Sequence, residues 1–160
     1  MRAVIQRVRR ASVKVGDDVV AEIGPGLLIL LGVGREDGEE EARWLAEKIV
    51  RLRIFDDAQG RLNRSLLEVS GEALVVSQFT LYGDTRKGLR PSFDQAADPG
   101  RARGLYQKLI DNLISLGVKT SAGVFQARML VTLENDGPVT LIVESPSFTP
   151  THPLPLQGGG

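Results

Sequence analysis

The sequence predicts a mixed α/β fold: layers of largely antiparallel β-sheet, about seven strands in all, with two long helices packed on one side. Short stretches of alternating or continuous apolar residues recur along the chain, and each is typical of a strand. Only two segments have the apolar spacing of a long helix. Strand and helix segments do not alternate strictly, which favours a mixed sheet over one built from β-α-β units.

Three strands are expected at the start of the chain. Residues 3–15 alternate apolar with polar side chains for most of their length, which predicts one long or bent strand with one solvated face. Residues 19–23 form a second expected strand, and the turn at 24–26 leads into a third at 27–33. Because the third run is apolar throughout, we expect a central strand that is covered on both faces.

The first helix is expected from Gly38 onward, where the apolar period changes. Its apolar face carries Ala42, Leu45, Ile49 and Leu52. The acidic residues 39–41 lie in its first turn, where the helix dipole favours negative charge. The chain then passes through the turn-rich residues 56–60 and a short irregular stretch to a buried strand expected at 73–81.

The second helix is expected after a loop at 82–97. Asp98 and Pro99 are a favourable N-cap and first helical residue, and Gly117 closes the helix. Its apolar face carries Leu105, Leu109, Leu113 and Leu116. Two strands follow at 125–134 and 139–144, and the residues between them are typical of a hairpin connection. These residues are Asn135, Asp136, Gly137 and Pro138.

Composition is that of an ordinary soluble globular protein with one domain. The chain has 160 residues, of which 42% are hydrophobic and 25% charged, with 20 basic and 20 acidic side chains. The longest apolar run, 27–31, is far too short to span a membrane, and no signal peptide is recognisable. We therefore expect a cytoplasmic protein with no membrane partner. The lack of cysteine excludes disulfide scaffolds, thiolate metal sites and cysteine nucleophiles.

A single histidine, His152, limits the available chemistry. A Ser-His-Asp triad or a multi-histidine metal centre would have to use it, and it lies in the Pro- and Gly-rich tail 145–160, which we expect to be flexible. No cluster of metal-binding residue types stands out, so no metal and no cofactor is expected. The loop 32–38 differs from a dinucleotide-binding loop because its third glycine is one place late, and Asp37 would repel a pyrophosphate.

The segment Ser77-Gln78-Phe79-Thr80 ends a buried strand, a position where hydroxyls and free backbone amides commonly face a ligand. As a nucleophile, Ser77 or Thr80 would need a base. No adjacent residue supplies one, although Lys87 could approach in three dimensions. The hydroxyls could equally satisfy backbone groups at the end of the strand.

Two further features are candidates for ligand contacts. Gly137 leaves the peptide before Pro138 free of a side chain, so a ligand could approach the backbone closely, although an ordinary trans turn is the default. Positive charge is grouped at Arg7, Arg9 and Arg10, at Arg51 and Arg53, and at Arg86, Lys87 and Arg90. The last group lies beside Thr80 and supplies candidate phosphate contacts, although such groups are commonly only solvated surface.

Two motifs together resemble the signatures of the D-aminoacyl-tRNA deacylases, formerly called D-tyrosyl-tRNA deacylases. They are Ser77-Gln78-Phe79-Thr80-Leu81 and Asn135-Asp136-Gly137-Pro138-Val139-Thr140. Other segments look like that family in the same order: Ile5-Gln6-Arg7-Val8, Ala11-Ser12-Val13, the Gly-x-Gly-Leu-Leu stretch at 24–28, Arg90-Pro91-Ser92-Phe93 and Gly123-x-Phe125-x-Ala127-x-Met129. The likeness covers residues 1–144, which we take as one domain, and only the tail departs from it.

The resemblance implies an aminoacyl-tRNA editing hydrolase. It would cleave the ester that joins a D-amino acid, or glycine mischarged on tRNA-Ala, to the terminal adenosine of tRNA. It also implies a homodimer with the active site at the subunit interface. There Gly137-Pro138, whose peptide is cis in the family, would enter the other subunit's pocket beside residues 77–80 and exclude an L side chain. Arg7 matches the arginine that holds this motif. Three positions match the surroundings of the adenosine: Phe125, Ala127 and Met129.

The resemblance further implies catalysis without a side-chain base. The ribose 2′-hydroxyl of the tRNA would activate the water, and protein amides around Phe79 and Thr80 would stabilise the oxyanion. An older interpretation of the family makes the residue at Thr80 a nucleophile, and the lack of a partner base argues against it here. Two other functions remain open from the residues. One is a non-catalytic tRNA-binding module that uses Arg86, Lys87 and Arg90, and the other is a small-molecule hydrolase with Ser77 or Thr80 as its nucleophile.

Overall fold

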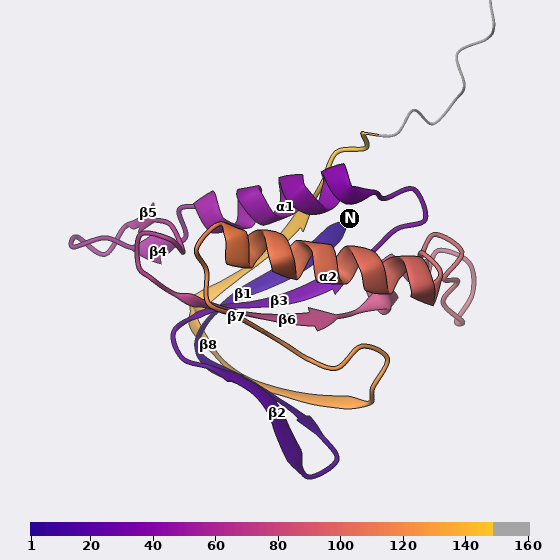
Figure 1. Cartoon of the computed structure of the whole chain (residues 1–160), viewed down its shortest axis with the longest axis horizontal. Coiled ribbons are helices and arrows are strands. Elements are labelled where there is room, and N and C mark those ends of the chain that lie inside the picture. The colour runs from indigo at the N-terminus through magenta and orange to yellow at the C-terminus, as the bar shows by residue number, and fades with distance from the viewer. Residues whose placement is uncertain (149–160) are drawn as a thin grey trace, which may run out of the picture.

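The protein forms one mixed β-sheet with two helices side by side on one face (Figure 1). The computed structural model describes residues 1–148. The elements in chain order are β1 (Arg2–Val15), β2 (Asp18–Ile23), β3 (Gly26–Gly32), α1 (Glu39–Arg51), β4 (Phe55–Asp56), β5 (Leu62–Arg64), β6 (Glu72–Ser77), the 3-10 helix η1 (Phe79–Tyr82), α2 (Pro99–Ser115), β7 (Thr120–Ala122) and β8 (Met129–Glu144). The predicted fold class, with both long helices on one side, is confirmed.

The main sheet has six strands in the order β2-β1-β3-β6-β7, and β8 pairs with β1. The strand β1 runs antiparallel to β2, β3 and β8, while β3–β6 and β6–β7 are parallel pairs. The first half of β1 pairs with β3, and its second half pairs with β2. The predicted long strand at 3–15 is therefore confirmed, and it serves as the spine that joins two parts of the sheet.

Two apolar cores form because the strand β3 alternates its side chains between the two faces of the sheet. Leu27 and Ile29 pack under the helices, whereas Leu28 packs into a second core with Val13 and Val76. The second core lies where β2 and the far ends of β1 and β8 curl under the opposite face (Figure 1). The prediction of a central strand covered on both faces is confirmed.

Both long helices are confirmed, and each begins within one residue of its predicted start. The Glu41 carboxylate accepts a hydrogen bond from the Gly38 backbone N–H at 2.8 Å, which caps α1. The Asp98 side chain accepts from the Arg101 N–H at 3.1 Å, and Pro99 is the first residue of α2. The predicted apolar faces are buried except at Leu52 and Leu116, which are half-buried cap residues. None of the helices in residues 1–148 is long and apolar enough to cross a membrane.

Two strand boundaries were predicted wrongly. The strand expected at 73–81 ends at Ser77, because the chain turns into η1 with hydrogen bonds from the Leu81 N–H to the Gln78 carbonyl and from the Gly83 N–H to the Thr80 carbonyl. Residues 125–128 are not part of a strand either. Gln126 has a φ of 63°, which is incompatible with a strand, and β8 begins only at Met129.

The hairpin predicted at residues 135–138 is also wrong. β8 runs antiparallel to β1 on both sides of this segment, with Asn135 opposite Val8 and Thr140 opposite Gln6. The chain therefore does not reverse direction. Residues 136–139 instead form a bulge that leaves the ladder and returns to it, which we call the 136–139 loop. A true hairpin, β4–β5, occurs in the stretch that was expected to be irregular.

The tail begins with ordered contacts. The Ser145 backbone N–H donates to the Met1 carbonyl at 2.9 Å, and the Phe148 N–H donates to Glu41 Oε1 at 3.0 Å. Residues 149–160, with His152 among them, lie outside the described residues.

Candidate functional site

A cavity of about 660 Å³ lies at the carboxyl ends of β3 and β6. The structure brings six of the predicted site residues together in its lining: Ser77, Gln78, Phe79, Phe125, Ala127 and Met129. The first residues of α2 complete one wall, since Pro99 and Ala102 also face the cavity. A pocket of this size with a mostly apolar lining can hold a ligand as large as a nucleoside.

The floor of the site is the abrupt end of β6. The Gln78 backbone N–H donates to the Leu31 carbonyl at 2.7 Å, which fixes the first residue after the strand to β3. The chain then enters η1, and the first N–H groups of a helix have no partner within the helix. Within residues 1–148, the backbone N–H groups of Phe79 and Thr80 donate to no acceptor. Two free donors therefore lie beside the cavity, an arrangement that suits a developing negative charge on a ligand oxygen.

The hydroxyl groups of this segment have no basic partner. The Thr80 hydroxyl accepts a hydrogen bond from the Gln78 side-chain amide, and Thr80 does not line the cavity. In the described part of the chain, Lys87 makes no hydrogen bond or ion pair with Ser77 or Thr80. Nothing in this geometry activates either hydroxyl as a nucleophile.

Three aromatic rings line the cavity: Phe79, Phe93 and Phe125. Phe79 and Phe93 make an edge-to-face contact with 5.1 Å between ring centroids. The Phe125 ring packs 5.8 Å from Tyr106, and the Arg103 guanidinium lies 5.6 Å from the Phe125 ring. Rings placed in this way offer faces on which a nucleobase can stack.

Tyr106 was missed by the sequence reasoning, although its spacing of three and seven residues from Leu109 and Leu113 places it on their helical face. Its hydroxyl donates to the Val75 carbonyl at 3.0 Å, which ties α2 to β6 beside the site. Burial raises the pKa of Tyr106 to about 12, so the phenol stays neutral at physiological pH. Phe93 was noted only as part of a motif, and its contact with Phe79 requires a long loop that periodicity does not describe.

Arg7 organises a second group of predicted residues. Its side chain is buried, and Nε donates to the Asp136 carbonyl at 2.9 Å while Nη1 donates to the Ile54 carbonyl at 2.9 Å. Gly137 lies directly against the guanidinium, because a Cβ at this position would collide with Arg7 Nη2. The Gly137-Pro138 peptide bond is cis. None of these residues lines the cavity, so one chain does not bring its 136–139 loop to its own cavity.

The basic loop beside the cavity is only partly available for a ligand. Arg86 donates to both carboxylate oxygens of Asp84, with Nη2 2.7 Å from Oδ2, and this pairing lowers the pKa of Asp84 to about 2. Lys87 and Arg90 are exposed and make no ion pair in the described residues. The other predicted basic residues of the first strand are paired instead, Arg9 with Asp136 and Arg10 with Glu134.

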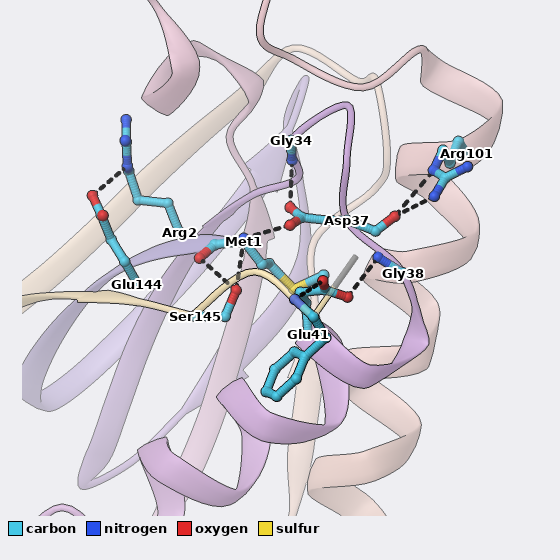
Figure 2. A network of polar contacts seen from close by, with 10 residues as sticks. Met1, Arg2, Gly34, Asp37, Gly38, Glu41, Arg101, Glu144 and Ser145 are labelled. Carbon is cyan, nitrogen blue, oxygen red and sulfur yellow. Dashed lines mark hydrogen bonds and ion pairs between the residues drawn. The ribbon is translucent and has the colours of Figure 1, made fainter. Parts of the chain in front are cut away.

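A network of polar contacts surrounds Asp37 and ties the start of β1 to the loop at 32–38 (Figure 2). The Asp37 carboxylate accepts from the Met1 amine at 2.7 Å and from the Gly34 N–H at 2.6 Å. Arg2 donates to the Leu81 carbonyl at 2.7 Å, which anchors η1 to β1. Because the Gly34 N–H is already bound, the loop at 32–38 is an internally satisfied turn. No group of three or more potential metal ligands occurs within residues 1–148.

Comparisons with known proteins agree over most of the chain. The model of the D-Tyr-tRNA(Tyr) deacylase family matches residues 4–144. A D-aminoacyl-tRNA deacylase of Roseiflexus sp. is 61% identical over 148 residues, which are 92% of this chain and 96% of the relative. One of Heliobacterium modesticaldum is 58% identical over 144 residues, 90% of this chain and 96% of the relative. Among solved structures, the c-Myc DNA Unwinding Element Binding Protein matches with a TM-score of 0.87 and 40% identity, covering 91% of this chain and 99% of that one.

Proposed function

Because this chain belongs to the D-Tyr-tRNA(Tyr) deacylase family, we propose that it hydrolyses the ester bond between a D-amino acid and the terminal adenosine of tRNA. The structural observation that carries the proposal is the cavity at the end of β6. It has aromatic walls for a nucleobase and two free backbone N–H groups beside it, at Phe79 and Thr80.

The residues of the cavity divide between the two parts of this substrate. Phe125, Ala127 and Met129 surround the adenosine, and Phe79 and Phe93 line the same cavity. Ser77, Gln78 and Phe79 line the cavity where β6 ends and face the ester, and Thr80 contributes its backbone N–H from beside the cavity. The position of Tyr106 under Phe125 supports this division, because it fixes the ring that faces the base.

The reaction depends more on correct positioning of the ester and the attacking water than on acid-base side chains of the protein. A water molecule attacks the ester carbonyl carbon, and the neighbouring ribose 2′-hydroxyl of the tRNA accepts the hydrogen bond that activates the water. The Phe79 and Thr80 N–H groups donate to the carbonyl oxygen as it becomes an oxyanion. The bond between the carbonyl carbon and the 3′-oxygen then breaks, and the 3′-oxygen leaves with the proton that the attacking water gave up to the 2′-hydroxyl, which releases the tRNA with a free 3′-hydroxyl and the free D-amino acid. The lack of any basic partner for Ser77 or Thr80 in the described residues supports this mechanism.

Chiral selection comes from the Gly137-Pro138 segment of a second copy of the chain. The 136–139 loop leaves the β1–β8 ladder and does not line its own chain's cavity, so it is free to enter another one. A fixed backbone at the ester excludes an L side chain and spares a D side chain. Glycine has no side chain to reject, so glycyl-tRNA formed by mischarging of tRNA-Ala is also a substrate. The working unit is accordingly a homodimer with its sites at the interface.

The remaining assignments follow from the same substrate. Lys87 and Arg90, with Arg86 after release from Asp84, contact phosphates near the aminoacylated 3′ end of the tRNA. Residues 1–144 form the catalytic domain, and 145–160 are a tail outside it. The protein works in the cytoplasm without a metal or cofactor.

The 2′-hydroxyl is tested by comparing D-Tyr-tRNA that ends in adenosine with D-Tyr-tRNA that ends in 2′-deoxyadenosine. Enzymatic acceleration over the spontaneous rate should fall by about a hundredfold or more in the deoxy substrate, as expected for loss of general base assistance. Equal acceleration of both esters would contradict the 2′-hydroxyl mechanism. Binding of both tRNAs with no acceleration of either would favour a tRNA-binding module.

A further inference from the structure

The 136–139 loop has no paired residues in β1, unlike the parts of β8 on either side of it. Only one residue of β1, Arg7, separates the partners of Asn135 and Thr140, so residues 136–139 have no place in the ladder. A loop of this kind can shift unless other groups replace the missing ladder bonds. The described residues show which side chains do so.

Asn135 holds the base of the loop through both hydrogens of one amide group. Its Nδ2 donates to the Arg7 carbonyl at 3.0 Å and to the Val139 carbonyl at 3.0 Å. The first bond ties the loop's entrance to β1, and the second ties its entrance to its exit. Because a primary amide nitrogen carries two donors, Asn135 uses its full donating capacity at this point.

The side chain and the backbone of Arg7 both contact the loop. The Arg7 guanidinium donates into the loop at the Asp136 carbonyl, while the Arg7 backbone carbonyl accepts from Asn135. Arg7 therefore limits how far Gly137 can move toward the β4 side, and Asn135 limits how far the loop can open at its base. Neither residue lines the cavity of its own chain.

We propose that Asn135 is a positioning residue for chiral selection: its amide keeps the 136–139 loop closed, so that Gly137-Pro138 is held where it excludes an L-aminoacyl ester. This inference rests on the proposed function. Replacing Asn135 loosens the loop but leaves the cavity, the end of β6 and the free N–H groups intact. The D ester is then still hydrolysed, and the L ester gains access.

Two variants separate this role from a general loss of structure. In Asn135→Asp a carboxylate with no donor faces the two carbonyl oxygens, whereas Asn135→Ala removes the group without adding charge. Glu134→Gln is the matched control, because Glu134 is the preceding residue of β8 and pairs with Arg10 instead of the loop. The measurement is kcat/KM for D-Tyr-tRNA and for L-Tyr-tRNA on the same enzyme preparation.

Both Asn135 variants should lower the D-to-L ratio of kcat/KM at least tenfold, mainly through faster hydrolysis of the L ester, and Glu134→Gln should keep the wild-type ratio. The fraction of folded enzyme cancels in the ratio, so poor folding cannot mimic the effect. A wild-type ratio in both Asn135 variants, even with a lowered Tm, would overturn the inference and leave the proposed function standing. A wild-type enzyme that does not distinguish the two esters would overturn both.

Discussion

The buried guanidinium of Arg7 binds backbone carbonyls of neighbouring segments. Its guanidinium reaches two backbone carbonyls, Asp136 and Ile54, and lies 3.3 Å from the Asp56 carboxylate. A buried arginine without such partners would be strongly destabilising, because its desolvation would not be offset. The contact requires a glycine at 137, where the φ of +123° and the closeness of Arg7 leave no room for a side chain.

The change Gly137→Ala should therefore lower the free energy of unfolding by about 1–3 kcal/mol, the usual cost of a strained backbone position. It should also lower the D-to-L ratio of hydrolysis, because Arg7 must move. Chemical denaturation measures the first effect. Gly104→Ala is the control. Gly104 lies in α2 with open space at its Cβ position, so this change should raise the free energy of unfolding by about 0.5–1 kcal/mol. A Gly137→Ala protein as stable as the wild type would contradict this description.

Thr80 has a hydroxyl without a base, and its backbone N–H is the group that matters in the proposed mechanism. Thr80→Ala removes the hydroxyl and keeps the N–H, so hydrolysis of D-Tyr-tRNA should stay within about tenfold of wild type, less than the usual effect of losing an acid-base group. Steady-state hydrolysis measures this. Complete loss of turnover with an intact fold and intact tRNA binding would instead identify Thr80 as a direct participant.

At the scale of elements, the site depends on where β6 stops and where α2 starts. β6 ends at Ser77 and places η1 at the floor of the cavity, while the first turn of α2 places Pro99 and Ala102 in its wall. The Asp98 cap fixes the start of α2 through its bond to the Arg101 N–H. The shape of the cavity thus depends on where one strand ends and where one helix begins.

Asp98→Ala should lower the free energy of unfolding by about 1 kcal/mol, because the first turn of α2 loses its side-chain acceptor. For a chain of this size, that corresponds to a Tm about 2–4 °C lower. Thermal unfolding followed by circular dichroism measures it. Asp111→Ala is the control, since Asp111 lies on the exposed face of the same helix and, within residues 1–148, accepts only from Gln107. Equal effects of the two changes would show that the cap does not stabilise the helix start.

The helices were predictable from sequence because both signals are local. The apolar spacing and the residues at Gly38 and Asp98 act within a few turns, and the structure confirms both helices. The 136–139 loop was not predictable, since the same turn-forming residues suit a hairpin and a bulge. Only the pairing of β8 with β1 on both sides, a long-range contact, decides between them. For the same reason, motifs in the sequence indicated Ser77 and Phe125 as site residues, but only the folded structure shows that both line one cavity with Phe93.

At the scale of the whole molecule, the cavity and the 136–139 loop, which we propose to act together, do not meet within one chain. The cavity lies at the carboxyl ends of β3 and β6, whereas the 136–139 loop belongs to the β1–β8 ribbon. None of residues 136–139 lines the cavity of the same chain. In the proposed homodimer, the loop of one copy would meet the cavity of the other.

Mixed dimers test this arrangement. One chain carries Ala127→Trp, which fills its cavity, and the other carries Gly137→Ala, which disturbs its loop. If the loop acts on the partner's cavity, the open cavity of the second chain meets the intact loop of the first, and the wild-type D-to-L ratio should return. The two homodimers provide the controls, the first inactive and the second unselective. An unselective mixed dimer, or a protein that is monomeric while active, would show that the loop does not act across an interface.

The most direct test of the whole proposal is hydrolysis of D-Tyr-tRNA and L-Tyr-tRNA by the purified protein, side by side, with a control without enzyme for spontaneous deacylation. The D ester should be lost far faster than it is spontaneously, while the L ester should decay at the spontaneous rate. Acceleration of both esters alike would contradict chiral exclusion, and acceleration of neither, with tRNA still bound, would contradict the assignment as a deacylase.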